Sequence, residues 1–148
     1  MTLKDHFNED LKTALKSGDG NRAQVLRFLL AQLHNREIEK HGTGKGSELT
    51  DEETIQVLQK EAKKRREAID LFRKGGRDDL VKKEERELEV LDNYLPKPFT
   101  REEVGKIVEE LMSTGLRDFN ALMKETMKRV AGRSDGRTVG ELIREKIQ

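Results

Sequence analysis

Apolar residues recur every three or four positions along most of the chain, which is the period of an amphipathic α-helix. The first such stretch carries Leu3, Phe7 and Leu11 and ends at a glycine-containing segment, residues 17–20. Strict alternation of apolar and polar residues, the pattern of a half-buried strand, occurs nowhere in the sequence. The pattern therefore predicts an all-α protein.

A second helix is expected to have apolar residues around more than one stripe of its surface. Its apolar positions are Val25, Leu26, Phe28, Leu29, Leu30, Leu33 and Ile38. Such a helix is stabilised by burial on several sides, so we expect it at the centre of the fold. The glycine-rich residues 42–47 then predict a loop. In this loop Lys45 is followed by Gly46 and not by Ser or Thr, which excludes a P-loop for nucleotides.

Two long helices are predicted on either side of Gly75-Gly76. Thr50 can begin the first of them, and Asp78 can cap the second. The apolar seam of the first is interrupted by one charge; its positions are Ile55, Leu58, Ala62, Arg65, Ile69 and Phe72. Because the connection is short, we expect the two helices to run antiparallel.

A structural ion pair is expected between these two helices. Arg65 lies eleven residues before Gly76, and Glu87 lies eleven residues after it. In an antiparallel pair Arg65 therefore reaches the level of Glu84 and Glu87. A charge at such a seam position fixes the register of the helices even where it adds little net stability.

Both prolines of the chain, Pro96 and Pro98, follow the fourth predicted helix. Proline cannot continue a helix and biases the preceding residue toward extended geometry, so we place a domain boundary here. Three short helices, opened by Thr100, Asp118 and Thr138, are expected beyond it. The predicted fold is an N-terminal four-helix domain, residues 1–95, followed by a small three-helix domain, residues 96–148.

Composition supports helices with charged outer faces. Of the 148 residues, 33% are hydrophobic and 40% are charged, whereas charged residues make up about 25% of typical soluble domains. Thirty basic and 29 acidic residues leave a formal charge of +1, so no global field points to nucleic acid or membrane. The chain has no cysteine and no membrane-spanning apolar run. We therefore expect a cytoplasmic location and no membrane partner.

Candidate catalytic and metal sites are sparse. The three histidines, His6, His34 and His41, have no acidic or cysteine partner at a recognised ligand spacing. The serines fall at predicted helix ends and in loops, where capping explains them. We therefore expect no catalytic residue, no metal and no cofactor.

Two basic clusters remain as candidate binding surfaces. Residues 116–137 carry six basic and three acidic residues, and Lys124 and Lys128 share a helix face because they are four positions apart. The candidate phosphate contacts are Lys124, Lys128, Arg129, Arg133 and Arg137. A secondary basic patch is Lys63, Lys64 and Arg66. A solvated surface without a ligand is the alternative for both clusters.

The sequence resembles the YqeY-like family over essentially its whole length. The resemblance rests on the order and spacing of several short segments. They are Leu26-Arg27, Gly76-Arg77-Asp78-Asp79-Leu80, Tyr94-Leu95-Pro96, Met127-Lys128, Gly132-Arg133 and Glu141-Leu142-Ile143-Arg144-Glu145-Lys146. Members of this family are similar to the C-terminal tail of GatB, the tRNA-binding subunit of the glutamyl/aspartyl-tRNA amidotransferase. One departure is Lys124, at a position where the family often has glycine.

The resemblance implies a two-part helical fold and an association with tRNA-dependent amidation, a carbon–nitrogen ligase process with glutamine as amide donor. It does not imply catalysis by this chain, since the GatB domain that binds Mg²⁺ and ATP has no counterpart here. We therefore predict an accessory tRNA-binding module. An aminoacyl-tRNA synthetase and an amidotransferase subunit are further candidate partners.

Two other functions stay open on the sequence alone. One is an adaptor whose helices dock an aminoacylation or amidation enzyme without touching RNA. The other is an autonomous ligase or amidase, which needs a polar pocket with perturbed titratable groups.

Overall fold

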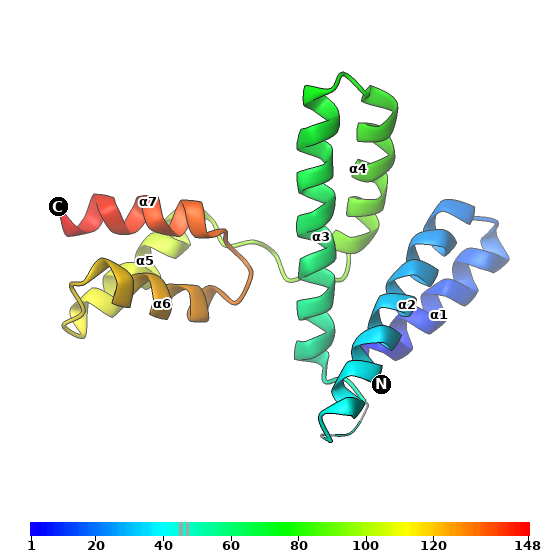
Figure 1. Cartoon of the computed structure of the whole chain (residues 1–148), viewed down its shortest axis with the longest axis horizontal. Coiled ribbons are helices and arrows are strands. Elements are labelled where there is room, and N and C mark those ends of the chain that lie inside the picture. The colour runs from blue at the N-terminus through cyan, green and yellow to red at the C-terminus, as the bar shows by residue number, and fades with distance from the viewer. Residues whose placement is uncertain (45, 47) are drawn as a thin grey trace. The chain divides into compact units, whose positions relative to one another are not determined.

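A computed structural model describes residues 1–44, 46 and 48–148; Lys45 and Ser47 of the predicted glycine-rich loop lie outside the described residues. The described residues form seven α-helices and no strand, which confirms the all-helical prediction (Figure 1). The helices are α1 (Leu3–Ser17), α2 (Gly20–Gly42), α3 (Asp51–Lys74), α4 (Asp78–Asp92), α5 (Arg101–Ser113), α6 (Phe119–Val130) and α7 (Gly136–Ile147).

The chain divides into two compact units, Met1–Leu95 and Pro96–Gln148. Each unit has its own hydrophobic core. Independent folding of the two units as separate domains stays a prediction.

The first unit consists of two helical hairpins, α1–α2 and α3–α4 (Figure 1). Its core is built mainly from α2 and the helices around it; the fully buried large side chains are Phe7, Leu26, Leu29, Leu33, Leu58 and Leu91. The expectation that α2 is covered on every apolar side is only partly met. Phe28 is 41% exposed and Ile38 is 58% exposed, so the buried surface of α2 is one broad face.

The capping signals position most helix starts as predicted. Thr50 accepts a hydrogen bond from the backbone N–H of Glu53, whose side chain accepts one from the N–H of Thr50 in return. Equivalent boxes at Thr2 and Thr100 begin α1 and α5. Because these boxes satisfy otherwise unpaired N–H groups, they determine where each helix begins.

Two predicted helix starts are wrong. Arg77, not Asp78, is the N-cap of α4, and no side chain caps that end; Asp78 is already the first helical residue. In the last helix Asp135 is the N-cap and accepts from the backbone N–H of Thr138. The helix therefore begins at Gly136, three residues earlier than an N-cap at Thr138 would place it. Asp135 offers a carboxylate to the same turn, so the threonine is not needed as the cap.

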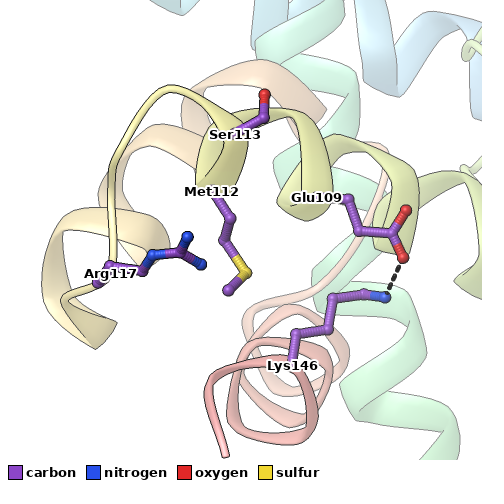
Figure 2. Close-up of a pocket in the computed structure, with 5 residues that line it drawn as sticks. All are labelled: Glu109, Met112, Ser113, Arg117 and Lys146. Atoms are coloured by element: carbon purple, nitrogen blue, oxygen red, sulfur yellow. Dashed lines mark hydrogen bonds and ion pairs between the residues drawn. The ribbon is translucent and has the colours of Figure 1, made fainter.

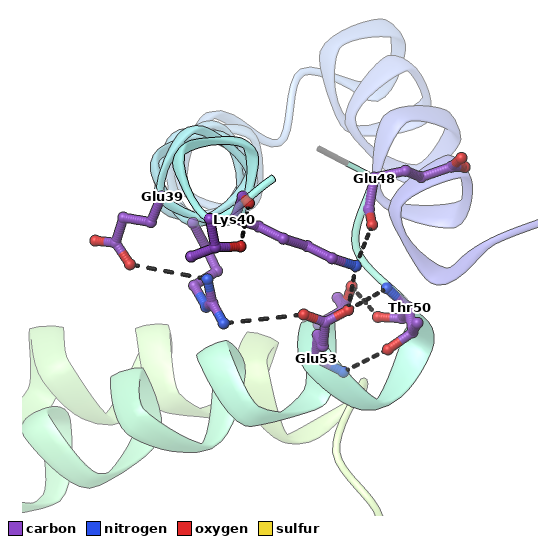
Figure 3. Close-up of polar contacts among 8 residues, drawn as sticks. Glu39, Lys40, Glu48, Thr50 and Glu53 are labelled. Carbon is purple, nitrogen blue, oxygen red and sulfur yellow. Dashed lines mark hydrogen bonds and ion pairs between the residues drawn. The ribbon is translucent and has the colours of Figure 1, made fainter. Parts of the chain in front are cut away.

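Lys40 connects the end of α2 to the start of α3 (Figure 3). Its ammonium donates to the carbonyl oxygen of Glu48 and to the carboxylate of Glu53, both at 2.7 Å. Together with the backbone N–H of Thr50, this lysine lowers the pKa of Glu53 to about 2. The contact closes the loop between the two helices with a charge-assisted hydrogen bond.

Tyr94 connects the end of the first unit to its beginning. Its ring lies 4.2 Å from that of Phe7, centroid to centroid. Its hydroxyl donates to Asp10 at 2.5 Å and accepts from Arg22 at 3.1 Å. Burial, followed by the hydrogen bond to Asp10, raises the pKa of Tyr94 to about 12.

The second unit is a three-helix cluster of α5, α6 and α7. All three helices contribute to its core; the buried apolar residues are Val104, Val108, Leu122, Val130, Val139, Leu142 and Ile143. Within this unit, the residues before α5 are attached to the turn after α6 through Phe99, whose backbone N–H donates to the carbonyl of Arg133 at 2.8 Å.

The raised pKa of Tyr94 predicts a specific alkaline loss of stability. The fold favours the neutral phenol, so its contribution is complete below pH 10, the ordinary pKa, and is lost as the pH rises toward about 12. Urea unfolding at several pH values should show a steeper fall in this interval for the natural chain than for Tyr94→Phe. Parallel curves for the two proteins would contradict this role.

Candidate nucleic-acid interface

The three candidate cations on α6 are exposed but differ in their partners. Arg129 forms an ion pair with Glu110 on α5 at 2.7 Å, and Lys128 lies 3.7 Å from Glu125 on its own helix. Lys124 has no ion pair within 4 Å among the described residues. The two paired cations have side chains 45% and 64% exposed, so solvent and salt screen these contacts. Lys124 is therefore the α6 cation with the least compensated charge.

Arg133 occupies the turn between α6 and α7. Its guanidinium stacks on the ring of Phe99 at 3.8 Å, and its Nε–H donates to the carbonyl of Lys97 at 2.7 Å. No carboxylate of the described residues lies within 4 Å of this guanidinium. At longer range its positive charge adds to the hydrogen bonds from Thr100 that lower the pKa of Glu103. The neighbouring Gly132 has φ +81°, a conformation that side chains rarely adopt.

Arg137 at the start of α7 belongs to an ion-pair network. Its Nε–H lies 3.3 Å from Glu141, which also accepts from Arg101 on α5 at 3.1 Å. Arg101 binds Glu145 at 3.1 Å as well. The hydrogen bond from Arg101 is the main cause that lowers the pKa of Glu141. Arg137 thus shares a carboxylate that ties α7 to α5.

The tail cations therefore do not form one uncompensated positive patch. Lys128, Arg129 and Arg137 each lie beside a carboxylate. Lys124 and Arg133 lack one within 4 Å among the described residues. The five residues are exposed or half-buried, and whether they contact phosphates stays a prediction. Their partners, Glu125, Glu110 and Glu141, lie on the same helix or on α5, and a count of charges along the sequence does not show these pairs.

The secondary patch on α3 is less compensated than the tail. Lys63 and Arg66 are exposed and have no ion pair within 4 Å among the described residues. Lys64 lies 3.2 Å from Glu61 and keeps 68% of its side chain exposed.

Arg65 lies between helices of the first unit, with only 11% of its side chain exposed. Its guanidinium is 3.5 Å from Glu87 on α4 and 4.0 Å from Glu61 on α3, and it lies over the ring of Phe28 at 5.2 Å. Glu84 is not among its ion-pair partners in the described part of the chain. Glu61 was missed in the sequence; its position four residues before Arg65 is the signal that could have found it.

The second unit also has a shallow pocket beside α5 (Figure 2). It has a volume of about 380 Å³ and is lined by Glu109, Met112, Ser113, Arg117 and Lys146. Lys146 bonds Glu109 at 2.6 Å and lowers its pKa. The Ser113 hydroxyl donates to the carbonyl of Glu110 at 2.5 Å. The pocket thus presents a carboxylate held in its charged form and a serine engaged by backbone, not a nucleophile paired with a base.

No group of three or more His, Asp or Glu side chains in residues 1–44, 46 and 48–148 is arranged to hold a metal ion. In the same part of the chain, no helix has both the length and the apolar character needed to cross a bilayer.

A family model described as Yqey-like protein matches residues 4–147. The chain belongs to the YqeY-like family. This confirms the resemblance noted in the sequence, and the likeness to the GatB tail is consistent with it.

Curated relatives come from fungi. The chain is 32% identical to Altered inheritance of mitochondria protein 41, mitochondrial, of Lachancea thermotolerans, an alignment that covers 96% of this chain and 77% of the relative. For the Kluyveromyces lactis protein of the same name the identity is 33%, over 92% of this chain and 71% of the relative. For that of Eremothecium gossypii it is 36%, over 61% of this chain and less than half, 47%, of the relative.

These names correct one expectation. The relatives are named as mitochondrial proteins, which contradicts the predicted cytoplasmic location. The prediction rested on the absence of cysteine and of an apolar run, and neither property distinguishes one reducing aqueous compartment from another.

The buried ion pairs of Arg65 generate an asymmetric prediction for stability. Arg65→Leu should leave the protein folded and cost less than about 2 kcal/mol, because Glu61 keeps Lys64 at 3.2 Å and Glu87 is partly exposed. Glu61→Leu with Glu87→Leu should cost about 3–5 kcal/mol, because the guanidinium then stays buried without a carboxylate. Urea denaturation at pH 7 measures both changes. Equal losses in the two variants would show that the pairing is unimportant.

Proposed function

We propose that this chain is an accessory, non-catalytic module linked to tRNA-dependent amidation, and that its second unit contacts tRNA phosphates through α6 and the turn into α7. Two facts support the proposal: membership of the YqeY-like family and the resemblance of that family to the tRNA-binding tail of GatB. The contact would be to the RNA backbone, since one tyrosine and five phenylalanines offer few rings for stacking bases.

The environment of Arg133 is the single observation that carries this proposal. Phe99 and the carbonyl of Lys97 hold one side of its guanidinium. The remaining N–H groups have no carboxylate within 4 Å among the described residues. A positioned, uncompensated guanidinium is suited to bidentate contact with a phosphate. The adjacent Gly132 has no side chain to keep a backbone phosphate at a distance.

The ion pairs of Lys128 and Arg129 limit what these residues contribute. Exposed ion pairs are worth about 0–1 kcal/mol, so a phosphate can displace Glu125 or Glu110. Each displacement leaves a carboxylate close to the RNA, which reduces the gain. We therefore expect modest affinity that falls steeply with salt.

One observation favours a second candidate function, the adaptor that docks an amidation or aminoacylation enzyme. Lys128, Arg129 and Arg137 lie beside carboxylates, and a surface of alternating charge suits a protein partner better than a polyanion. Under this alternative the chain would bind its partner equally well after ribonuclease treatment.

Removing the competing carboxylates tests the RNA proposal by a gain of binding. Glu110→Gln with Glu125→Gln releases Arg129 and Lys128 from their partners, so tRNA should bind about 3- to 10-fold more tightly at 0.1 M salt. Fluorescence anisotropy with labelled tRNA measures the change.

The matched control removes two exposed carboxylates from the first unit, Glu9→Gln with Glu89→Gln. It makes the same change in net charge and should alter the affinity less than 2-fold. Equal gains in the two double variants would indicate a net-charge effect, and no gain in either would leave the adaptor as the better account.

A further inference from the structure

The outward face of α3 carries a row of cations. Lys60, Lys63 and Lys64 lie at positions i, i+3 and i+4 and therefore on one side of the helix, and Arg66 follows Lys63 by three residues. All four are exposed. We call these four residues the outer α3 surface. The opposite side of the helix carries the buried Leu58, Ala62 and Ile69.

Glu61, the carboxylate that follows Lys60 in the sequence, is buried and not part of the outer α3 surface. Glu61 is the only acidic residue between Lys60 and Arg66, and it is only 4% exposed. It faces Arg65, 4.0 Å away, on the inner side of the helix, and Lys64 reaches it at 3.2 Å. Glu61 thus compensates Arg65 and Lys64 but forms no ion pair with Lys60, Lys63 or Arg66 in the described part of the chain, which a linear charge count does not detect.

The remaining cations of the row are uncompensated at close range. Lys60, Lys63 and Arg66 have no ion pair within 4 Å in the described part of the chain. Two exposed carboxylates follow them on the same helix: Glu67, four residues after Lys63, and Asp70, four residues after Arg66. Neither forms an ion pair within 4 Å among the described residues, so they reduce the positive charge of this surface without cancelling it. The contrast with the tail is clear, because there Lys128 and Arg129 both lie beside carboxylates.

The chemistry of the outer α3 surface favours a phosphate backbone over a protein surface. Protein interfaces are centred on large apolar or aromatic anchors. The exposed large apolar residue on this helix is Leu71, which lies beyond the row. Interfaces with nucleic acid are polar and positive, and cations clustered along a helix are their electrostatic footprint.

We infer that the outer α3 surface is a second binding site for RNA phosphates, separate from the α6–α7 turn and located on the first unit. That the ligand is RNA rests on the proposed function, whereas the location of the site rests on the exposed cations of α3. Each of the three unpaired cations neutralises one phosphate and releases counterions, so the surface contributes its own share of the salt dependence.

The test uses the full chain and labelled tRNA over a series of salt concentrations. The variant Lys60→Gln/Lys63→Gln/Arg66→Gln removes three exposed charges that form no ion pair within 4 Å in the described part of the chain. It should lower the slope of log K against log[salt] by about 2–3 and weaken binding at least 10-fold at 0.1 M salt. The matched control, Lys12→Gln/Lys82→Gln/Lys83→Gln, removes three exposed cations from α1 and α4 and should change the slope by less than about 1.

A tail variant, Lys124→Gln/Lys128→Gln/Arg129→Gln, measured in the same series separates this inference from the proposed function. A loss in the α3 variant and in the tail variant supports both sites. A loss in the α3 variant alone supports this inference and overturns the tail contact. A loss in the tail variant alone, or an α3 variant that behaves like its control, overturns this inference.

Discussion

The structure depends on one constraint: each helix has enough apolar residues to bury one face and no more. Hydrophobic residues make up 33% of the chain and charged residues 40%, so two cores form from single stripes and every helix keeps a charged outer face. Burial of those stripes is the main stabilising contribution. It also decides which charged residues remain at the surface, and hence which are available to a ligand.

The two units use their charged faces differently. In the second unit, Arg101, Arg129 and Lys146 form ion pairs that connect one helix to another. These exposed contacts add little to the stability that the apolar core provides, but they neutralise much of the basic composition. In the first unit, Glu61 lies on the inner side of α3 with Arg65. Lys60 and Lys63 thereby lie at the surface without an ion pair within 4 Å among the described residues. The sequence suggested fewer candidate phosphate contacts in the first unit than in the second, but the first unit has the less compensated positive surface.

The sequence was sufficient for the helical fold because its signals are local. Periodicity gave the seven helices, and the Thr50 and Thr100 boxes gave their starts, since a cap needs only residues three positions apart. The start of α7 was misplaced because Asp135 and Thr138 compete for the same turn. Counting residues on either side of the short turn was enough to predict that Arg65 lies opposite Glu87. Counting could not show that Glu84 is not a partner of Arg65, because this depends on the direction of the side chains.

The candidate site was harder to predict because charge compensation is not local. Glu110 and Arg129 are 19 residues apart and on different helices, so no window of sequence shows that they pair. Arg133 likewise owes its fixed position to Phe99 and to the carbonyl of Lys97. Family membership supports the proposed link to amidation, whereas the geometry indicates which cations lie without a carboxylate within 4 Å among the described residues.

We propose that RNA contacts the cations that have no carboxylate within 4 Å in the described part of the chain. Lysine acetylation of the full chain with and without tRNA, followed by mass spectrometry, tests this claim at single residues. The account predicts protection of Lys60, Lys63 and Lys124 by tRNA, with Lys12 and Lys82, exposed on other faces, reacting as before. Equal protection of all five lysines, or of none, would contradict it.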